Sequence, residues 1–226
     1  MMKANSPALI LYLFASFFAV IGIVFKNEFL ILLMKPVIVP SILVYYLQIN
    51  KTKTNMLFLF AILCSFAADM IVMFELESGD VLIALLNIVM YLVFIYFSVK
   101  EIPRGKITAL RFFHLGLIVF GCLIVLWIIL DLMTSLDEFT FNIYIIYGFI
   151  LTLLASIIGF NHLNKQNIKT FYALIMCICF IVSDVFFAIY NFYMPMEIFI
   201  LLNVTVQFAS YYYMVKYITT TKNNHL

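Results

Sequence analysis

Long apolar runs separated by short polar segments follow one another along the chain. Eight runs can be marked, at roughly 7–25, 29–48, 55–74, 79–98, 110–130, 139–160, 169–190 and 194–218. A helix of about 20 apolar residues crosses the hydrocarbon core of a bilayer, whereas a membrane β-barrel would show alternating segments of about 10 residues. The pattern therefore predicts an all-α, polytopic membrane protein, with residues 1–226 forming a single bundle of eight transmembrane helices.

The composition agrees with a chain that lives in lipid. Hydrophobic residues make up 66% and charged residues only 11%, and the mean hydropathy is +1.16. A soluble domain carries about 25% charged residues, so soluble, secreted and disordered proteins are excluded. A net charge of +2 spread along the chain also excludes a nucleic-acid partner. The first run is too long for the apolar part of a signal peptide, and no small-residue cleavage site follows it.

Charges in the loops orient the eight predicted spans. On one side lie basic residues, with Glu101 as the acidic exception: Lys3, Lys51, Lys53, Lys100, Arg104, Lys106, Arg111, Lys165, Lys169, Lys216 and Lys222. On the other side lie acidic residues, with Lys26 as the basic exception: Glu28, Glu75, Glu77, Asp80, Asp131, Asp137, Glu138 and Glu197. The positive-inside rule then places both termini in the cytoplasm, and in a bacterium the protein would lie in the cytoplasmic membrane.

Three ionisable residues remain inside the predicted spans: Lys35, Asp69 and Asp184. Each costs about 2.5–3.5 kcal/mol at a helix centre, which a purely structural role rarely justifies. From the helix rise, all three lie about 8–10 Å below the outer surface, and the carboxamides of Asn87 and Asn203 lie at similar depth. The common depth predicts one polar site near the outer face.

Two structural readings compete with a functional site. Lys35 could be an anchor whose ammonium reaches the membrane surface, and the two aspartates could hold helices together. One lysine balances only one carboxylate, and two like charges in a low dielectric cannot both ionise comfortably. One aspartate should therefore hold its proton, as a general acid requires. The sequence leaves open which one, although the neighbours Ala68 and Met70 make Asp69 the more apolar candidate.

A repeated spacing suggests two related halves. The segment from Cys64 to Asp69 has the spacing of Cys179 to Asp184, and an asparagine follows on the next span in each case, from 69 to 87 and from 184 to 203. Parallel repeats over 1–100 and 105–220 would bring the polar groups together where the halves face each other. Nothing in the second half corresponds to Lys35.

No cofactor or metal site is expected. The four cysteines all fall inside apolar runs, without metal-type spacing around a histidine. No HExxH, GxSxG or phosphate-binding glycine loop occurs in the sequence.

The same residues resemble the YhhN-type membrane proteins, the lysoplasmalogenase family. The matching features are Lys35-Pro36 at the second span, the small residues that precede Asp69, the segment Phe180 to Asp184, and the Tyr212-Tyr213 segment near the end. The chain departs from the family pattern at Ala68, where glycine is expected, at Asn87, which replaces a histidine, and at Lys216, which replaces a glutamine.

The resemblance implies hydrolysis of the vinyl ether bond of a lysophospholipid, releasing a fatty aldehyde and a glycerophospho-alcohol. One aspartic acid would protonate the alkenyl carbon, and a carboxylate would stabilise the cation and orient water, as in glycoside hydrolysis. Lys35 would tune the pair of aspartates or contact the phosphate. The candidates for substrate contacts are Asn87, Asn203, Ser65, Ser183 and Tyr91. The partners expected are this lipid substrate and the membrane lipids.

A small transporter or channel for an amphiphile or ion is the alternative function, with the same residues as a proton relay. It requires polar residues down to the cytoplasmic side, whereas the inner halves of the third and seventh spans, 56–63 and 171–176, are almost wholly apolar. A membrane scaffold without chemistry would leave the buried acids unexplained.

The charge balance generates a testable prediction. At neutral pH one of the two intramembrane carboxyl groups keeps its proton, because one lysine balances only one negative charge. Infrared or NMR titration of the purified protein should therefore show one protonated carboxyl group assigned to Asp69 or Asp184. Two fully ionised carboxylates at neutral pH would contradict this expectation.

Overall fold

A computed structural model describes residues 6–50, 54–74, 79–102, 109–133 and 136–220, and these residues form eight helices. The helices are α1 (Pro7–Val24), α2 (Glu28–Ile49), α3 (Met56–Met73), α4 (Gly79–Val99), α5 (Ala109–Leu132), α6 (Glu138–Asn164), α7 (Ile168–Phe192) and α8 (Glu197–Thr219). All eight are long and apolar enough to cross a membrane. The predicted all-α membrane bundle is confirmed.

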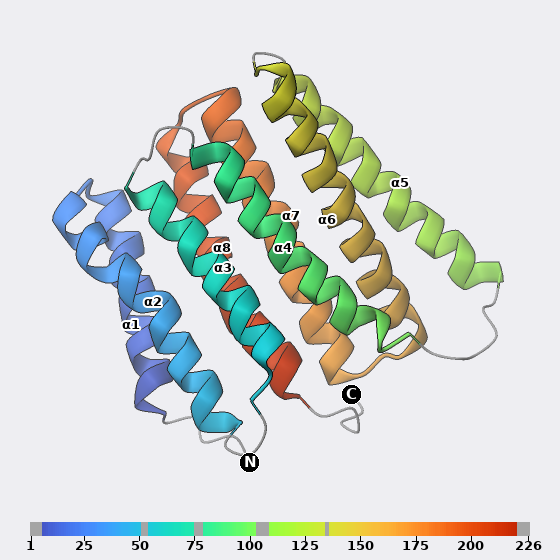
Figure 1. Ribbon diagram of the computed structural model, residues 1–226, viewed down its shortest axis with the longest axis horizontal. Coiled ribbons are helices and arrows are strands. Elements are labelled where there is room, and N and C mark those ends of the chain that lie inside the picture. Colours follow the sequence, from blue (N-terminus) through green and yellow to red (C-terminus); the bar gives the residue numbers. More distant parts are fainter. Residues whose placement is uncertain (1–5, 51–53, 75–78, 103–108, 134–135, 221–226) are drawn as a thin grey trace.

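Contacts between helix ends show that the chain runs up and down through the bundle. At one end the Tyr46 hydroxyl accepts from the Asn55 amide at 2.9 Å, and the Asn161 side chain donates to the Ser98 carbonyl at 2.7 Å. At the opposite end Lys26, in the turn before α2, pairs with Glu197 at the start of α8. The start of α1 and the end of α8 lie at the first end (Figure 1). We call it the basic end and the opposite one the acidic end.

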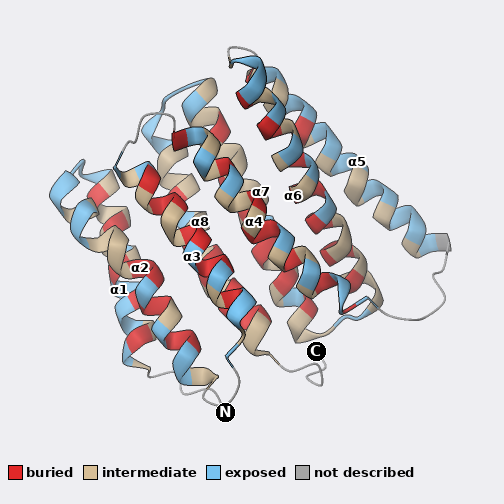
Figure 2. Cartoon of the chain, viewed as in Figure 1, coloured by how far each residue is buried: buried red, intermediate tan, exposed pale blue. Residues whose placement is uncertain are grey.

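The helices are spread across a wide, flat bundle. The α1–α2 pair occupies one edge and α5 the other, with α3, α4, α6, α7 and α8 between them (Figure 1). Helix α5 packs on α6 and α7 and carries many exposed apolar side chains, among them Trp127, which is 71% exposed (Figure 2). Exposed apolar side chains are expected on a surface that meets lipid, since lipid tails are as apolar as leucine.

The two charges that break the predicted segregation are both paired. Lys26, at the acidic end, pairs with Glu197, and the hydrogen bond to this carboxylate, together with its charge, raises the pKa of the lysine. Glu101, at the basic end, binds Lys169 at 2.5 Å in a largely buried ion pair. Which end faces the cytoplasm stays a prediction. Several of the charges on which this prediction rests lie outside the described residues: Lys3, Lys51, Lys53, Glu75, Glu77, Arg104, Lys106 and Lys222. His225 also lies outside them.

Two helix ends differ from the predicted spans for local reasons. Helix α6 continues to Asn164, beyond the apolar run, because the amide of Asn161 binds the end of α4 and Asn164 donates to Phe160 of its own helix. Helix α8 begins at Glu197 and not at 194. The amides of Tyr193 and Met194 both donate to the Ile189 carbonyl, so these residues close α7.

Aromatic side chains fill the core between the middle of the bundle and the basic end. Phe94 lies at the centre of this aromatic core, with its ring centroid 6.4 Å from Phe58, 6.0 Å from Phe180 and 6.4 Å from Tyr217. Phe94 and Phe58 are completely buried. This half of the described bundle is therefore closed by packed rings.

Close packing of α5 against α6 generates a prediction. A Cβ atom added at Gly159 would lie 2.8 Å from Ile118 Cδ1, whereas one added at Gly116 would meet nothing within 4 Å. Gly159→Leu should therefore push α5 away and lower the unfolding free energy by about 1–3 kcal/mol. Thermal unfolding of both variants in detergent measures this loss of stability. Gly116→Leu is the control, because it makes the same change in helix propensity. Equal midpoints for the two variants would contradict the packing described here.

Candidate functional site

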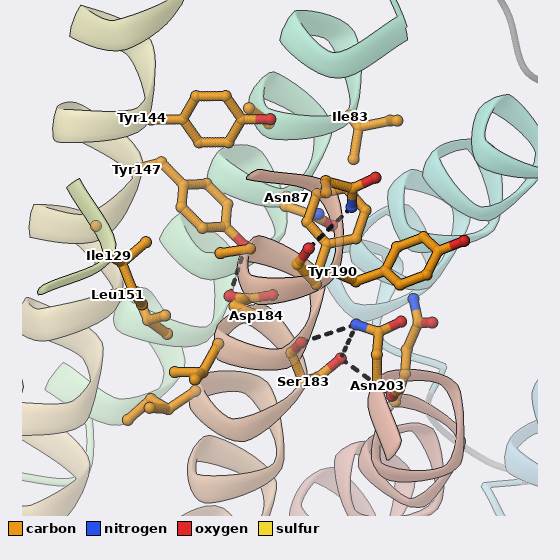
Figure 3. Close-up of a pocket in the computed structure, with 18 of the residues that line it drawn as sticks. Ile83, Asn87, Ile129, Tyr144, Tyr147, Leu151, Ser183, Asp184, Tyr190 and Asn203 are labelled. Atoms are coloured by element: carbon orange, nitrogen blue, oxygen red, sulfur yellow. Dashed lines mark hydrogen bonds between the residues drawn. The ribbon is translucent and has the colours of Figure 1, made fainter. Parts of the chain in front are cut away.

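A cavity of about 430 Å³ lies between the middle of the bundle and the acidic end. This volume falls in the usual range of small-molecule sites, about 300–1,000 Å³. Six of the eight site residues predicted from the sequence line it: Lys35, Asp69, Asn87, Ser183, Asp184 and Asn203. We call it the central cavity, and Figure 3 shows part of its wall.

Asp184, on α7, is held by two tyrosine hydroxyls through one oxygen. Tyr91 of α4 donates to Oδ2 at 2.7 Å and Tyr147 of α6 donates to the same atom at 2.6 Å, and the two hydroxyls lie 3.0 Å apart. Figure 3 shows Tyr147 pointing at the carboxyl group. No hydrogen bond from a described residue reaches the other oxygen, Oδ1. Asp184 therefore presents an oxygen that a ligand in the cavity can contact.

Asp69, on α3, is bound through both oxygens and is only 4% exposed. The Gln207 amide donates to Oδ1 at 2.7 Å and the Tyr211 hydroxyl to Oδ2 at 2.5 Å, both from α8. The Lys35 ammonium also acts electrostatically on this carboxyl group. Burial of this carboxyl group disfavours its charged form, whereas the charge of Lys35 and the two donors favour it.

The two asparagines have different surroundings. Asn203 of α8 donates to the Ser183 carbonyl at 2.8 Å and to its hydroxyl at 3.1 Å, which ties α8 to α7 (Figure 3). Asn87 of α4 also lines the cavity, but it forms no hydrogen bond with the residues that the structure describes. A carboxamide both donates and accepts, so Asn87 is free to bind a hydroxyl group or water.

Each aspartate accepts a hydrogen bond from a side chain in the other half of the chain. Asp69 of the first half accepts from Gln207, four residues after Asn203, and Asp184 of the second half accepts from Tyr91, four residues after Asn87. Asp184 also accepts from Tyr147 of its own half, and the two parallel repeats over 1–100 and 105–220 stay a prediction.

Two of the predicted site residues lie outside the cavity wall. Ser65 is buried one turn from Asp69, where its hydroxyl lies 2.7 Å from the Met90 sulfur, so it packs inside the bundle. Tyr91 is buried behind Asp184 and reaches the cavity only through the hydrogen bond to that carboxyl group. Tyr91 is therefore placed to position Asp184 more than to contact a ligand.

Sequence reasoning missed three of the four side chains that bind the aspartates: Tyr147, Gln207 and Tyr211. The signal at Gln207 was available, because it is a carboxamide one turn from Asn203 inside an apolar span. Tyr147 and Tyr211 gave no such signal, since the chain has 14 tyrosines and most of its spans contain one. Only the packing of helices identifies which hydroxyls meet a carboxyl group.

The site offers acid–base chemistry. Two carboxyl groups in unlike surroundings share one cavity, and such pairs can divide the roles of acid and base. In the described part of the chain, no three His, Cys, Asp or Glu residues are grouped so as to hold a metal ion.

The fold and the cavity define a class, small polytopic membrane proteins with an acidic site buried among their helices. Within that class, the YhhN family model matches residues 30–220, from the start of α2 to the end of α8, and the chain belongs to this family. The search of curated proteins and the search of solved structures found no match.

Two of the three departures from the family pattern lie at the cavity. Ala68 and Asn87 line it. Lys216 lies near the basic end of α8, where its ammonium is 5.0 Å from the centroid of the Tyr212 ring. A change at Lys216 therefore does not alter the wall of the central cavity.

The contacts of Asp184 generate a prediction. Tyr147→Phe removes one of its two donors, so the infrared absorption of the Asp184 carboxyl group should shift and the unfolding free energy should fall by about 1 kcal/mol. Tyr144→Phe is the matched control, because Tyr144 lines the same cavity and its hydroxyl forms no hydrogen bond with the described residues. An unchanged absorption in Tyr147→Phe would show that this hydrogen bond does not form.

Proposed function

We propose that the protein is a membrane-embedded hydrolase that cleaves the vinyl ether bond of lysoplasmalogen-type lysophospholipids. The observation that carries the proposal is the placement of two aspartates, with different partners, in one cavity of a bundle whose family includes lysoplasmalogenases. The products are a fatty aldehyde and a glycerophospho-alcohol.

The cavity has a polar side and an apolar side, as a single-chain lipid requires. Lys35, Asp69 and Asn203 belong to α2, α3 and α8, whereas α5 contributes mainly aliphatic side chains such as Val125, Leu126 and Ile129. The glycerophosphate part of the lipid binds on the polar side and the alkenyl chain on the apolar side.

The contacts of the two carboxyl groups favour Asp184 as the acid. A protonated Asp184 satisfies every contact if its proton sits on Oδ1, facing the cavity, while Oδ2 accepts from Tyr91 and Tyr147. Asp69, with Lys35 nearby and both oxygens accepting hydrogen bonds, remains the carboxylate. This assignment is the reverse of the preference drawn from the apolar neighbours of Asp69 in the sequence.

With Asp184 as the acid and Asp69 as the carboxylate, these two groups and one water molecule account for every proton transfer in the reaction. Asp184 gives its proton to the alkenyl carbon that is not bonded to the ether oxygen. The resulting oxocarbenium ion faces the Asp69 carboxylate. Water adds to this ion and gives its proton to Asp69, which forms a hemiacetal. The C–O bond to glycerol breaks as Asp69 returns a proton to the departing oxygen and the hemiacetal hydroxyl re-protonates Asp184. Such positioned proton transfers contribute about 10²–10⁴ in rate.

The remaining polar residues would orient the substrate. Asn87 has a carboxamide without a partner among the described residues, which suits it to hold the attacking water or a glycerol hydroxyl. Lys35 supplies a positive charge at the cavity wall, which suits it to contact the phosphate as well as to balance Asp69. Tyr91, Tyr147, Gln207 and Tyr211 act through the carboxyl groups as positioning residues.

The aromatic core supports an enzyme open to one side over a transporter. Phe58, Phe94 and Phe180 pack between the cavity and the basic end, where a conduit would need polar groups. With the positive-inside orientation, the cavity lies near the outer face of the membrane, and in a bacterium that membrane is the cytoplasmic one. A lipid of the outer leaflet could then reach it.

The test is aldehyde release by the purified protein from a lysoplasmalogen, compared with the saturated lyso-ether lipid of the same chain and headgroup. Only the vinyl ether should be cleaved, because only its double bond accepts a proton at carbon. Asp184→Asn and Asp69→Asn should each lower kcat by about 10²-fold or more. Asp131→Asn is the control, since Asp131 is exposed at the acidic end of α5 outside the cavity wall.

Two outcomes would count against the proposal. Unchanged turnover in both cavity variants would refute the assignment of the site. If purified wild-type protein cleaves no lyso-lipid, but moves an amphiphile or ion across vesicles, the transporter replaces the enzyme.

A further inference from the structure

The central cavity reaches the outside of the protein near the acidic end. Val72 of α3 and Asn191 of α7 both line the cavity and are exposed, and each is the last residue but one of its helix. Lys35 and Tyr190 line the cavity on the same side and bring polar atoms to it. We call this opening, bordered by these four residues, the polar mouth.

A further exposed lining residue, Gly121 of α5, lies far from the polar mouth. It is about 16 Å along the helix from the acidic end of α5. Leu117, Ile124 and Ile128 fall on the same helical stripe as Gly121, because they are three, four and seven residues away from it. All three are exposed apolar side chains that do not line the cavity. In a membrane-spanning helix, such a stripe faces lipid.

Gly121 therefore belongs to two surfaces of α5, the lipid-facing stripe and the cavity wall. Its neighbours in the wall, Cys122 and Val125, are half-buried, and Leu126 beyond them is buried. A Cβ atom at Gly121 would meet nothing within 4 Å, as expected for a position that the rest of the bundle does not cover. The cavity thus also meets the lipid-facing surface at Gly121, and we call this place the side opening.

The two carboxyl groups lie between the polar mouth and the side opening in depth. Asp69 is about 6 Å and Asp184 about 12 Å from the acidic ends of their helices, whereas Gly121 is about 16 Å from that of α5. Beyond Asp184 the wall is chiefly apolar, with Val125 of α5 and Ile181 of α7. A molecule that spans the cavity therefore meets polar groups first, then the carboxyl groups, and then an apolar passage to lipid.

We infer that the cavity holds a single-chain lipid whose polar end lies toward the polar mouth and whose hydrocarbon chain passes through the side opening into the bilayer. The inference rests on the proposed function, which places the vinyl ether beside Asp184. A chain that ends among lipid tails keeps the hydrocarbon environment that it had before binding. The length of the chain and the shape of its far end should then have little effect on binding.

A bulky group at the far end of the chain tests this path. The purified protein in lipid nanodiscs is given two vinyl ether lysolipids of one headgroup, a hexadecenyl lipid and the same lipid with a terminal pyrene. Their kcat/KM values should agree within about twofold, because the pyrene lies among the bilayer lipids. A chain enclosed by the protein would instead make the pyrene lipid poorer by about tenfold or more, which would overturn the side opening.

Blocking the side opening provides a second test. Gly121→Trp places a large ring there, so kcat/KM for the hexadecenyl lipid should fall by about tenfold or more relative to that for a butenyl lipid, whose chain ends inside the cavity. Gly116→Trp is the matched control, since Gly116 is exposed on the same helix but does not line the cavity. An equal ratio in Gly121→Trp, Gly116→Trp and wild-type protein would overturn the path.

Binding of saturated lyso-ether lipids, which are not hydrolysed, separates the path from the reaction. Thermal stabilisation of the wild-type protein should be the same with a plain hexadecyl chain and with a pyrene-terminated one. Gly121→Trp should lose this stabilisation and Gly116→Trp should keep it.

The outcomes distinguish this inference from the proposed function. Hydrolysis of the plain vinyl ether lipid but not of its pyrene derivative would overturn the side opening and leave the enzyme intact. Equal binding of both saturated lipids, lost in Gly121→Trp, without hydrolysis of either vinyl ether lipid would support the side opening and overturn the enzyme. No binding of either saturated lipid by folded wild-type protein would overturn the inference.

Discussion

Polar groups inside a bilayer need their partners within the protein, because lipid supplies none. In this bundle the requirement falls chiefly on Asp69 and Asp184. Asp69 takes hydrogen bonds from α8, and Asp184 takes them from α4 and α6. Each aspartate thereby joins helices far apart in the sequence, and the helices that these bonds join enclose the central cavity. Buried charge, helix assembly and candidate site are consequences of one constraint.

The same constraint separates the two aspartates chemically. Both oxygens of Asp69 accept hydrogen bonds, whereas Asp184 accepts two through one oxygen and none from the described residues through the other. The proposed function uses this difference, with Asp184 as the acid and Asp69 as the carboxylate. The aromatic core around Phe94 packs between them and the basic end, and aliphatic side chains of α5 line the cavity beside them. The proposed reaction needs these features together.

The sequence predicts the helices well because the bilayer imposes a length and a composition on each span. The second span, for example, is predicted at 29–48 and observed at Glu28–Ile49. Polar residues inside apolar spans stand out in the sequence, and the rise per residue placed Lys35, Asp69, Asn87, Asp184 and Asn203 at a similar depth. Rotation and packing are not predictable in this way. Tyr147 looks like any other tyrosine until α6 is placed against α7, and Ser65, one turn from Asp69, points at Met90.

Carbon protonation by a carboxyl group held on one side of the substrate is the central chemical claim. Hydrolysis in heavy water, with the aldehyde reduced at once and analysed by mass spectrometry and chiral NMR, tests it most directly. Transfer from a fixed Asp184 predicts one deuterium on the carbon next to the carbonyl, in a single configuration. A product without deuterium, or with deuterium in both configurations equally, would contradict the account.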